Sequence, residues 1–306
     1  MKTKTIDVII VTWNGMKWIQ KCLDALRKST YPVTTLMIDN LSTDDTVEYV
    51  KENYPEVRVI RSSKNLGFGQ ANNVGMRIAL KENADYVYLL NQDAYVYPDM
   101  FEKLMEVAES DTDNQYGIFS PLHVHTSGTK LDKHFKDYLK TVSPDILEDS
   151  FLTSAKKVYP VECVPAAGWL LPKKTLETIG GFDPVFFHYG EDVNYAQRLH
   201  FHGLKIGIVP SSMMIHDREE FGNESVYRKG EIQRTREAYG FLDVNLNTKQ
   251  RWSKFVRSYL YFALDVIKGN YKMLPEYSSS FFRILCRLSK YKKSREQNKK
   301  KGSNWL

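Results

Sequence analysis

The sequence is poor in cysteine and lacks a long uninterrupted hydrophobic run. Its three cysteines are Cys22, Cys163 and Cys286. They are widely separated and form no C-x-x-C pair, which argues against a disulfide framework or a thiolate zinc site and fits a reducing cytoplasm. The first apolar run is broken by Asp7 and predicts no signal peptide. The longest later run, residues 255–267, contains two charged residues and is too short to span a bilayer.

The remaining composition is that of an ordinary globular protein, with 42% hydrophobic, 13% aromatic and 26% charged residues. The net charge of +6 is unevenly distributed. Residues 249–301 contain 15 Lys and Arg against three acids, a local charge of +12, which leaves −6 for the rest of the chain. The acidic remainder of the chain and its basic C-terminal segment are therefore expected to have different functions.

The first hundred residues alternate short apolar runs with amphipathic stretches. We expect strands at 7–12, 34–39, 57–61 and 86–90, with helices at 16–29, 42–54 and 67–83 between them. This alternation predicts an α/β fold with a Rossmann-like, mostly parallel sheet and helices on both faces. Ser42 is expected to cap the second helix, with Asp45 three residues later. Further along, residues 145–157 are expected to form a loop.

Polar residues follow three of these strands. They are Thr12 and Asn14, Asp39 and Asn40, and Asn91 and Asp93. In open α/β sheets ligands bind beyond the carboxyl ends of the strands. A single polar strand end is more typical of a turn, because Asn and Asp favour turns, but three on one sheet edge favour a binding site.

Two segments contain residues suited to catalysis. The strand at 86–90 ends near Asp93, a carboxylate that suits Mg²⁺ or Mn²⁺, although an isolated Asp also caps turns. Residues 180–198 combine a glycine pair, an aromatic cluster and the adjacent acids Glu191 and Asp192. Acids in aromatic surroundings suit a general base with a raised pKa. The same pair also suits a helix N-terminus, where the helix dipole stabilises negative charge.

Taken in order, five pieces of the chain resemble glycosyltransferase family 2, and more narrowly its rhamnosyltransferase-like branch of bacterial enzymes that build surface polysaccharides. The pieces are Val11-Thr12-Trp13-Asn14, Met37-Ile-Asp39-Asn40, Asn65-Leu-Gly-Phe-Gly69, Leu90-Asn91-Gln92-Asp93, and Gly181-Phe-Asp183 through Glu191-Asp192 to Arg198. The resemblance covers residues 7–217. It implies a GT-A fold and inverting transfer from a nucleoside-diphosphate sugar.

The resemblance also implies roles for individual residues. The nucleotide-contacting set is Thr12, Asn14, Asp39, Asn40, Asn65, Asn72, Asn91 and Gln92. The metal ligands are Asp93 and His216, the catalytic pair is Glu191 with Asp192 as the base, and the acceptor contacts are Trp169 and Arg198. A core position for Trp169 and a structural role for His216 are the alternatives. The implied cofactor is Mn²⁺ or Mg²⁺, the donor dTDP-rhamnose or a UDP-hexose, and the acceptor a glycan or a lipid-linked molecule.

Two positions depart from the family pattern. Asn91 stands where the first acid of the D-x-D element is usual, and Asn194 where a further acid often follows the acid pair. A carbohydrate- or partner-binding protein with weakened catalysis is therefore one alternative. A sugar-1-phosphate nucleotidyltransferase is less favoured, because the loop at residues 13–16 lacks the glycine-rich, basic character such an enzyme needs.

We expect a catalytic domain at 1–245, with a nucleotide-binding half at 1–98 and an acceptor-binding half at 99–245, followed by a basic amphipathic helical region at 246–306. Apolar residues recur at helical spacing in that region between Lys and Arg. Such helices bind anionic membrane surfaces, which predicts a peripheral position on the inner face of the cell membrane. Packing on the catalytic domain and a homodimer interface are alternatives. Nucleic-acid binding is not expected, since no recognition motif accompanies the charge.

Overall fold

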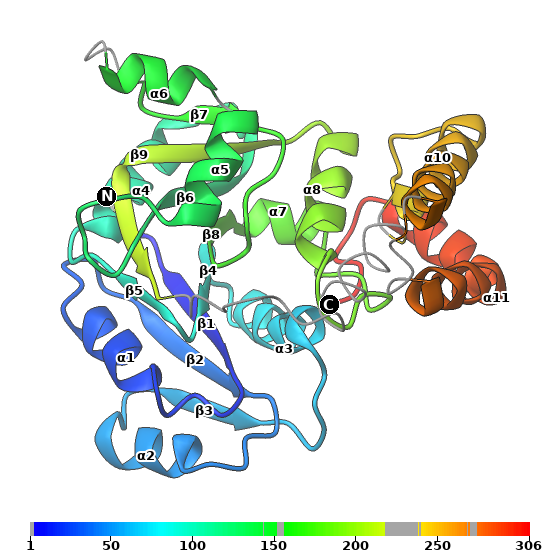
Figure 1. The fold of residues 1–306 in the computed structure, drawn as a ribbon. Helices are drawn as coiled ribbons and strands as arrows, with labels where there is room; N and C mark the ends of the chain where they lie inside the picture. The colour runs from blue at the N-terminus through cyan, green and yellow to red at the C-terminus, as the bar shows by residue number, and fades with distance from the viewer. Residues whose placement is uncertain are drawn as a thin grey trace.

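A computed structural model of the chain describes residues 3–142, 144–151, 156–217, 238, 240–267, 269 and 274–306. A nine-stranded sheet forms its centre (Figure 1). The strands are β1 (Ile6–Thr12), β2 (Thr34–Asp39), β3 (Arg58–Arg61), β4 (Tyr86–Asn91), β5 (Ala94–Val96), β6 (Tyr116–Val124), β7 (Tyr159–Val161), β8 (Gly168–Pro172) and β9 (Lys205–His216). Their order is β3-β2-β1-β4-β8-β6-β9-β5, with β7 paired to β9.

The α/β class is confirmed, and the parallel pairing holds for the first half of the sheet. Strands β3, β2, β1 and β4 are parallel neighbours, whereas β8 runs antiparallel to both β4 and β6. The second half is mixed, because β5 and β7 are also antiparallel to β9 while β6 is parallel to it. Apolar runs reveal strands but not their direction, so the sequence did not predict this mixture.

The helices pack on both faces of the sheet and extend beyond its end. They are α1 (Ile19–Arg27), α2 (Thr46–Asn53), α3 (Phe68–Lys81), α4 (Met100–Ser110), α5 (Lys133–Val142), α6 (Pro144–Phe151), α7 (Lys173–Thr178), α8 (Glu191–Phe201), α10 (Thr248–Ile267) and α11 (Leu274–Asn298). The prediction of a loop at residues 145–157 is wrong for the first part of that range, where α6 forms.

Ser42 does not cap α2, which begins only at Thr46. The Ser42 hydroxyl oxygen instead accepts a hydrogen bond from the backbone N–H of Asn14, at 2.9 Å. A partner distant in the sequence has therefore replaced the local capping bond that the sequence pattern predicted.

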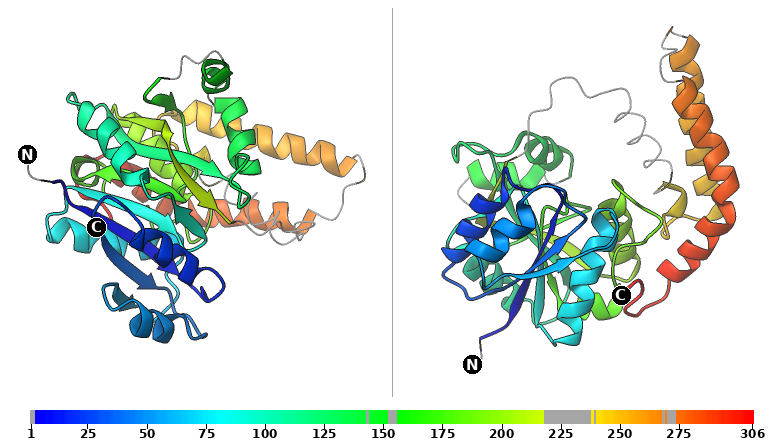
Figure 2. Two further views of the ribbon diagram at one scale, coloured as in Figure 1. Left: turned by 90° about the vertical axis from the view of Figure 1, so that its left-hand side faces the viewer. Right: turned by 90° about the horizontal axis from the view of Figure 1, so that it is seen from below.

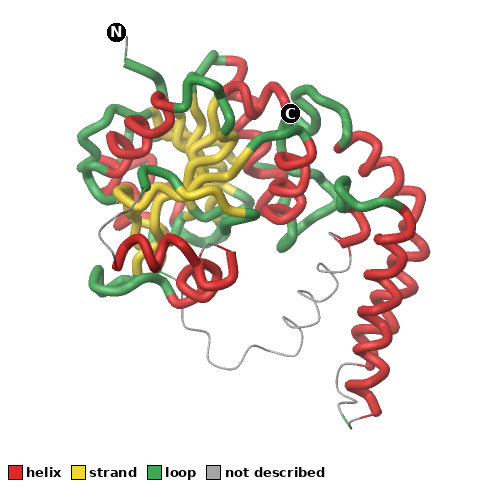
Figure 3. Tube along the Cα trace, turned by 90° about the horizontal axis from the view of Figure 1, so that it is seen from above, coloured by secondary structure: helices red, strands yellow, loops and turns green. Residues whose placement is uncertain are grey.

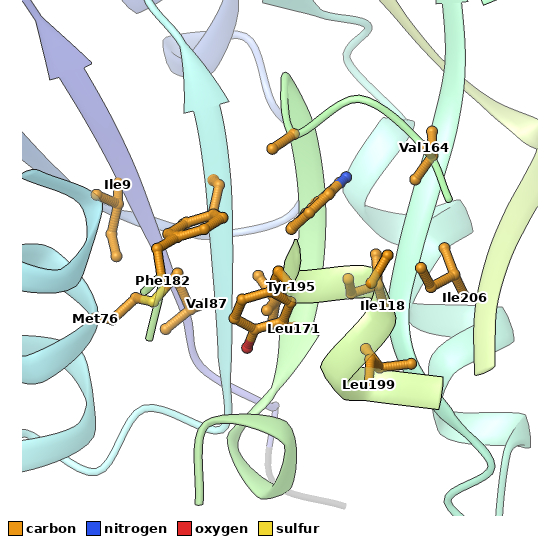
Figure 4. Packing of buried hydrophobic residues seen from close by; sticks show 14 of the residues in the cluster. Ile9, Met76, Val87, Ile118, Val164, Leu171, Phe182, Tyr195, Leu199 and Ile206 are labelled. Carbon is orange, nitrogen blue, oxygen red and sulfur yellow. The ribbon is translucent and has the colours of Figure 1, made fainter. Parts of the chain in front are cut away.

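The two faces of the sheet have separate hydrophobic cores because successive strand residues point to opposite sides. Ile9 packs with α3, α7 and α8 in one core, drawn in Figure 4. Its neighbours Val8 and Ile10 pack with α1 and α4 in the other. Both cores contain residues of β1, β2 and β4, so a packed interior holds the carboxyl ends of these strands in place.

Helices α10 and α11 lie side by side and project from the body as a hairpin (Figures 2 and 3). The last turn of α11 and the residues after it are bonded to the segment that precedes α8. The Asn298 amide nitrogen donates to a carboxylate oxygen of Asp183 at 2.7 Å, and the backbone N–H of Gly181 donates to the carbonyl of Asn304 at 2.8 Å. One end of the basic region therefore packs on the α/β body of the protein. None of the described helices is both long enough and apolar enough to cross a membrane.

Candidate active site

The three polar strand ends share one edge of the sheet, as predicted. Thr12 at the end of β1 lies opposite Asp39 at the end of β2, and Asn91 at the end of β4 lies opposite Val11. Parallel pairing in register brings these ends level. We call this rim, with the loops that follow the strands, the nucleotide edge, after the role that the sequence predicts for it.

Side-chain bonds join the loops of the nucleotide edge. The side-chain amide oxygen of Gln92 accepts a hydrogen bond from the Thr12 hydroxyl at 2.7 Å and another from the Trp13 backbone N–H at 3.1 Å. The Asn40 backbone N–H donates to the carbonyl of Thr12 at 2.7 Å. Thr12, Asn40 and Gln92 therefore set the positions of neighbouring loops.

Asp39 is fully buried, and its carboxylate has nearby donors. It accepts a hydrogen bond from the backbone N–H of Ser42 at 3.1 Å, and the Arg61 Nε lies 3.4 Å from its other oxygen. A buried carboxylate needs such partners, because desolvation otherwise costs several kcal/mol. Asn14, at a positive φ of 49°, accepts a bond from the Thr43 N–H at 2.8 Å, which holds the first loop against the second.

Asn40 and Asn65 shape the third loop of the edge. The Asn40 amide donates to the Asn65 side-chain oxygen at 3.0 Å and accepts from the Leu66 N–H at 2.7 Å. Gly67, at a positive φ of 75°, lies so close to the backbone of Phe187 that a Cβ would come within 2.0 Å of its carbonyl oxygen. The nucleotide edge therefore touches the segment that leads into the acid pair.

Asn72 lies in α3, the helix that follows the third loop. Its side chain is buried and donates to the carbonyl of Phe68, one turn earlier, at 3.0 Å. The nucleotide contact expected for Asn72 is not tested by this bond and stays a prediction. The periodicity of α3 turns this residue toward the core, whereas Asn65 stands in the exposed loop before the helix.

The two expected metal ligands lie together. An oxygen of Asp93 is 3.5 Å from Nε2 of His216, because Ala94 in β5 pairs with His216 in β9. Neighbouring ligands of one octahedral ion with bonds near 2.1 Å lie about 3 Å apart, so this pair fits with a small adjustment. Among the residues that the structure describes, no group of three or more His, Cys, Asp or Glu could hold a metal. The remaining ligands would have to come from a diphosphate and water.

The acid pair stands at the N-terminus of α8. Gly190, at a positive φ of 82°, ends the preceding loop, and Glu191 opens the helix. Asp192 is half-buried, and one of its oxygens accepts the backbone N–H of Val193 at 2.7 Å. Glu191 is buried and packs beside Gly69 at the start of α3. The acid pair thus abuts α3 in the N-terminal half of the chain.

The two acids have different environments. Burial, and secondarily the negative charge of Asp192, raise the pKa of Glu191 from 4.5 to about 8. One Glu191 oxygen is buried without a hydrogen-bond partner within the described part of the chain. Burial therefore favours the protonated form of Glu191, and Asp192 is the more exposed acid of the pair. This division of roles suits Asp192 as a base.

Glu191→Gln is expected to flatten the pH dependence of stability. Between pH 4.5 and about 8 the folded protein keeps a proton on Glu191 that the unfolded chain has released, so the free energy of unfolding falls as the pH rises. The fall is on the order of 1 kcal/mol per pH unit. Denaturant unfolding across this range should show that the free energy of unfolding of the variant, relative to that of the wild type, increases with pH. Glu162→Gln, at an exposed acid, is the control; a pH-independent gain for Glu191→Gln would contradict this assignment.

Trp169 is not a platform for a sugar ring. It is fully buried on β8 and stacks on Phe182 inside the core, so its expected acceptor contact is wrong and the core alternative is correct. Two exposed aromatic rings lie near the site instead: Trp13 at the nucleotide edge is 54% exposed, and Phe187 beside Gly67 is 56% exposed. Both belong to motifs visible in the sequence, but which aromatic residue faces solvent depends on the packing.

Arg198 is also an interior residue. Its guanidinium is buried and donates to the carbonyls of Gly181, at 2.7 Å, and of Ile179. It therefore holds the glycine turn before the acid pair in place, and the expected acceptor contact is wrong. Asn194 is buried as well, one turn after Glu191, so the position where the family often has a further acid lies in the interior.

Comparisons with known protein families match this architecture. The model of "Glycosyl transferase family 2" matches residues 7–151, and that of "Glycosyl transferase family group 2" matches residues 86–286, more than half of the chain. The chain therefore belongs to the family 2 glycosyltransferases and is a glycosyltransferase.

Two relatives of the chain are named as rhamnosyltransferases. The chain is 28% identical to the N-acetylglucosaminyl-diphospho-decaprenol L-rhamnosyltransferase of Mycobacterium tuberculosis, over 71% of this chain and 77% of that protein. It is 22% identical to the dTDP-rhamnosyl transferase RfbF of Shigella flexneri, over 72% of this chain and 71% of that protein.

A solved structure confirms the fold class. TarS 1–349 of S. aureus, in complex with UDP-GlcNAc, is similar with a TM-score of 0.58 and 15% identity, covering 90% of this chain and 79% of that one. The GT-A fold expected from the motifs is therefore present here.

Proposed function

We propose that the protein transfers a sugar, with inversion, from a nucleoside-diphosphate donor to a glycan or lipid-linked acceptor in bacterial surface polysaccharide synthesis. One observation carries the proposal: the acid pair packs directly against the nucleotide edge, and burial raises the pKa of its inner member, Glu191. The names of the two rhamnosyltransferase relatives favour dTDP-rhamnose as the donor, with a UDP-hexose second.

In this proposal the nucleotide edge receives the donor. Asp39 hydrogen-bonds the base, while Thr12, Asn14 and Asn65 line the pocket. The support is that their loops are joined by hydrogen bonds and need little reorganisation to bind, which lowers the entropic cost of ordering them.

Asp192 is the proposed catalytic base. Its carboxylate takes the proton of the acceptor hydroxyl while that oxygen bonds to the anomeric carbon, and the bond from this carbon to the diphosphate oxygen breaks. Attack from the face opposite the leaving group inverts the carbon. Glu191 keeps its own proton and so does not compete as a base.

Asp93 and His216 are the residues that would hold Mn²⁺ or Mg²⁺. Such an ion, when bound, neutralises negative charge on the diphosphate. Asn91 supplies no carboxylate, and its side-chain oxygen is buried without a hydrogen-bond partner among the described residues. The metal ligands that we propose for the protein are therefore one carboxylate and one imidazole rather than two carboxylates.

Release of nucleoside diphosphate across a panel of donors tests the function. Purified enzyme with Mn²⁺ should release dTDP from dTDP-rhamnose, or UDP from one UDP-hexose, faster than from the other donors. Binding of a nucleotide sugar without release of diphosphate would favour a binding protein with weakened catalysis. Formation of a nucleotide sugar from a nucleoside triphosphate and a sugar 1-phosphate would favour a nucleotidyltransferase.

We further propose a peripheral position on the cytoplasmic face of the membrane, where a lipid-linked acceptor would be found. The M. tuberculosis relative is named for a decaprenol-linked acceptor, which supports this placement. A homodimer through the C-terminal region is the alternative use of that surface.

A further inference from the structure

One side of α10 presents apolar residues to solvent along the whole helix. Its large exposed hydrophobic residues are Trp252, Val256, Leu260, Leu264 and Ile267. They recur every three or four residues and so form a single stripe. Leu260 is 60% exposed and Ile267 is 77% exposed, although each would ordinarily be buried. We call these five residues the α10 stripe.

The α10 stripe overlaps the face that holds the helix in place only at Trp252, whose ring packs on Phe241 and Phe255. Phe255 is buried and packs in a cluster with Phe241 and with Tyr291 and Leu288 of α11. The other four stripe residues take no part in this cluster, so the packing of the hairpin does not depend on them. A contiguous exposed apolar surface of this kind marks an interaction site.

The charge around the stripe indicates what it contacts. Among the side chains that the structure describes in the two helices, the exposed basic ones are Lys249, Lys254, Arg257, Arg287, Lys290, Lys292 and Lys293. Residues 249–301 carry a net +12, so a second copy of the hairpin would bring like charges together. An anionic lipid surface attracts this charge, and its interfacial region accepts apolar side chains.

The base of the hairpin is joined to the loop that leads to the acid pair. Asp183, nine residues before Asp192, accepts hydrogen bonds from the side chains of Ser294 and Asn298 in α11. Arg295 donates to the carbonyl of Leu246 at 2.7 Å, which ties α11 to the start of α10. The orientation of the hairpin is therefore fixed relative to the acceptor side of the enzyme.

We infer that the α10–α11 hairpin docks the enzyme on an anionic phospholipid surface, with the α10 stripe inserted among the headgroups and the basic residues at the phosphates. Because Asp183 joins the hairpin to the acid-pair loop, docking also sets the orientation of the acceptor site to the membrane. The inference rests on the proposed function only for the identity of that acceptor as lipid-linked.

Vesicle flotation of the full chain tests this inference. The wild type should float with vesicles of phosphatidylcholine mixed with phosphatidylglycerol and not with phosphatidylcholine alone, and added salt should weaken binding. The double variant Val256→Glu/Leu260→Glu should lower the partition coefficient at least about tenfold, since each change removes a large apolar side chain from the interface. Phe201→Glu, at an exposed apolar residue on α8, is the matched control and should float as the wild type does.

Two results would overturn the inference. One is a wild type that does not float with anionic vesicles. The other is a wild-type dimer in light scattering that the double variant converts to monomer without loss of flotation, which would assign the stripe to a second copy. Diphosphate release from the soluble donor is measured on the same samples. Normal diphosphate release without flotation refutes the docking surface and leaves the proposed function standing. Flotation without diphosphate release supports the docking surface and refutes the proposed function.

Discussion

Asp192→Asn is expected to lower kcat by about 10²- to 10⁴-fold, the range found when a general base is removed. Asparagine has nearly the same shape and can still accept the Val193 N–H, so the start of α8 should keep its structure. It cannot take the proton of the acceptor hydroxyl. Diphosphate release in the presence of acceptor measures the loss, and calorimetric titration with the nucleotide should give an unchanged affinity.

Glu191→Gln is the matched comparison for Asp192→Asn, because it alters the neighbouring acid without removing the base. Glutamine is close in shape and polarity to the protonated Glu191. We therefore expect Glu191→Gln to keep a far larger share of kcat than Asp192→Asn. Equal losses in the two variants, or turnover that survives in Asp192→Asn, would show that Asp192 is not the base.

Asp93→Ala is expected to abolish the effect of metal on nucleotide binding. In the wild type Mn²⁺ should tighten the binding of the matching nucleoside diphosphate at least about tenfold, since charge neutralisation by a metal is worth several kcal/mol. In the variant only His216 remains of the pair, and the affinities measured with and without Mn²⁺ should coincide. Calorimetric titration measures this directly and needs no turnover.

Asp99→Ala is the control for this variant, since Asp99 is a nearby acid that pairs with Lys103 on the surface. It should preserve the full metal effect. A metal effect that persists in Asp93→Ala would contradict the assignment of Asp93 and His216. A metal effect absent from the wild type would indicate that Asn91, in place of an acid, has removed the metal dependence.

The fold and the nucleotide edge were largely predictable because their signals are local. Apolar runs define β1, β2 and β4, and the polar residues that follow them reach one edge wherever the strands are parallel. The pairing of Asp93 with His216 was expected only from the family resemblance. The two residues are more than a hundred positions apart in the sequence, and the pairing of strand β5 with strand β9 brings their side chains together.

The errors share a physical cause. Trp169 and Arg198 have residue types that suit ligand contacts, but burial depends on which elements pack over them. Helix α8 covers Trp169, while Arg198 turns back to the glycine loop. The local sequence around these residues carries no information on those long-range contacts, so their exposure could not be predicted.

Periodicity, spacing and charge are properties of the chain, and they predicted the α/β class, the polar strand ends, the acid pair and the basic helical end. The glycosyltransferase activity was predicted from the resemblance to family 2. That Glu191 is buried while Asp192 remains half-exposed follows from the packing of distant segments. The tertiary structure also decided that α10 leaves an apolar stripe uncovered while α11 is fastened to Asp183. Burial is a relation between distant segments, and burial sets both which acid keeps its proton and which apolar surface is left to contact a partner.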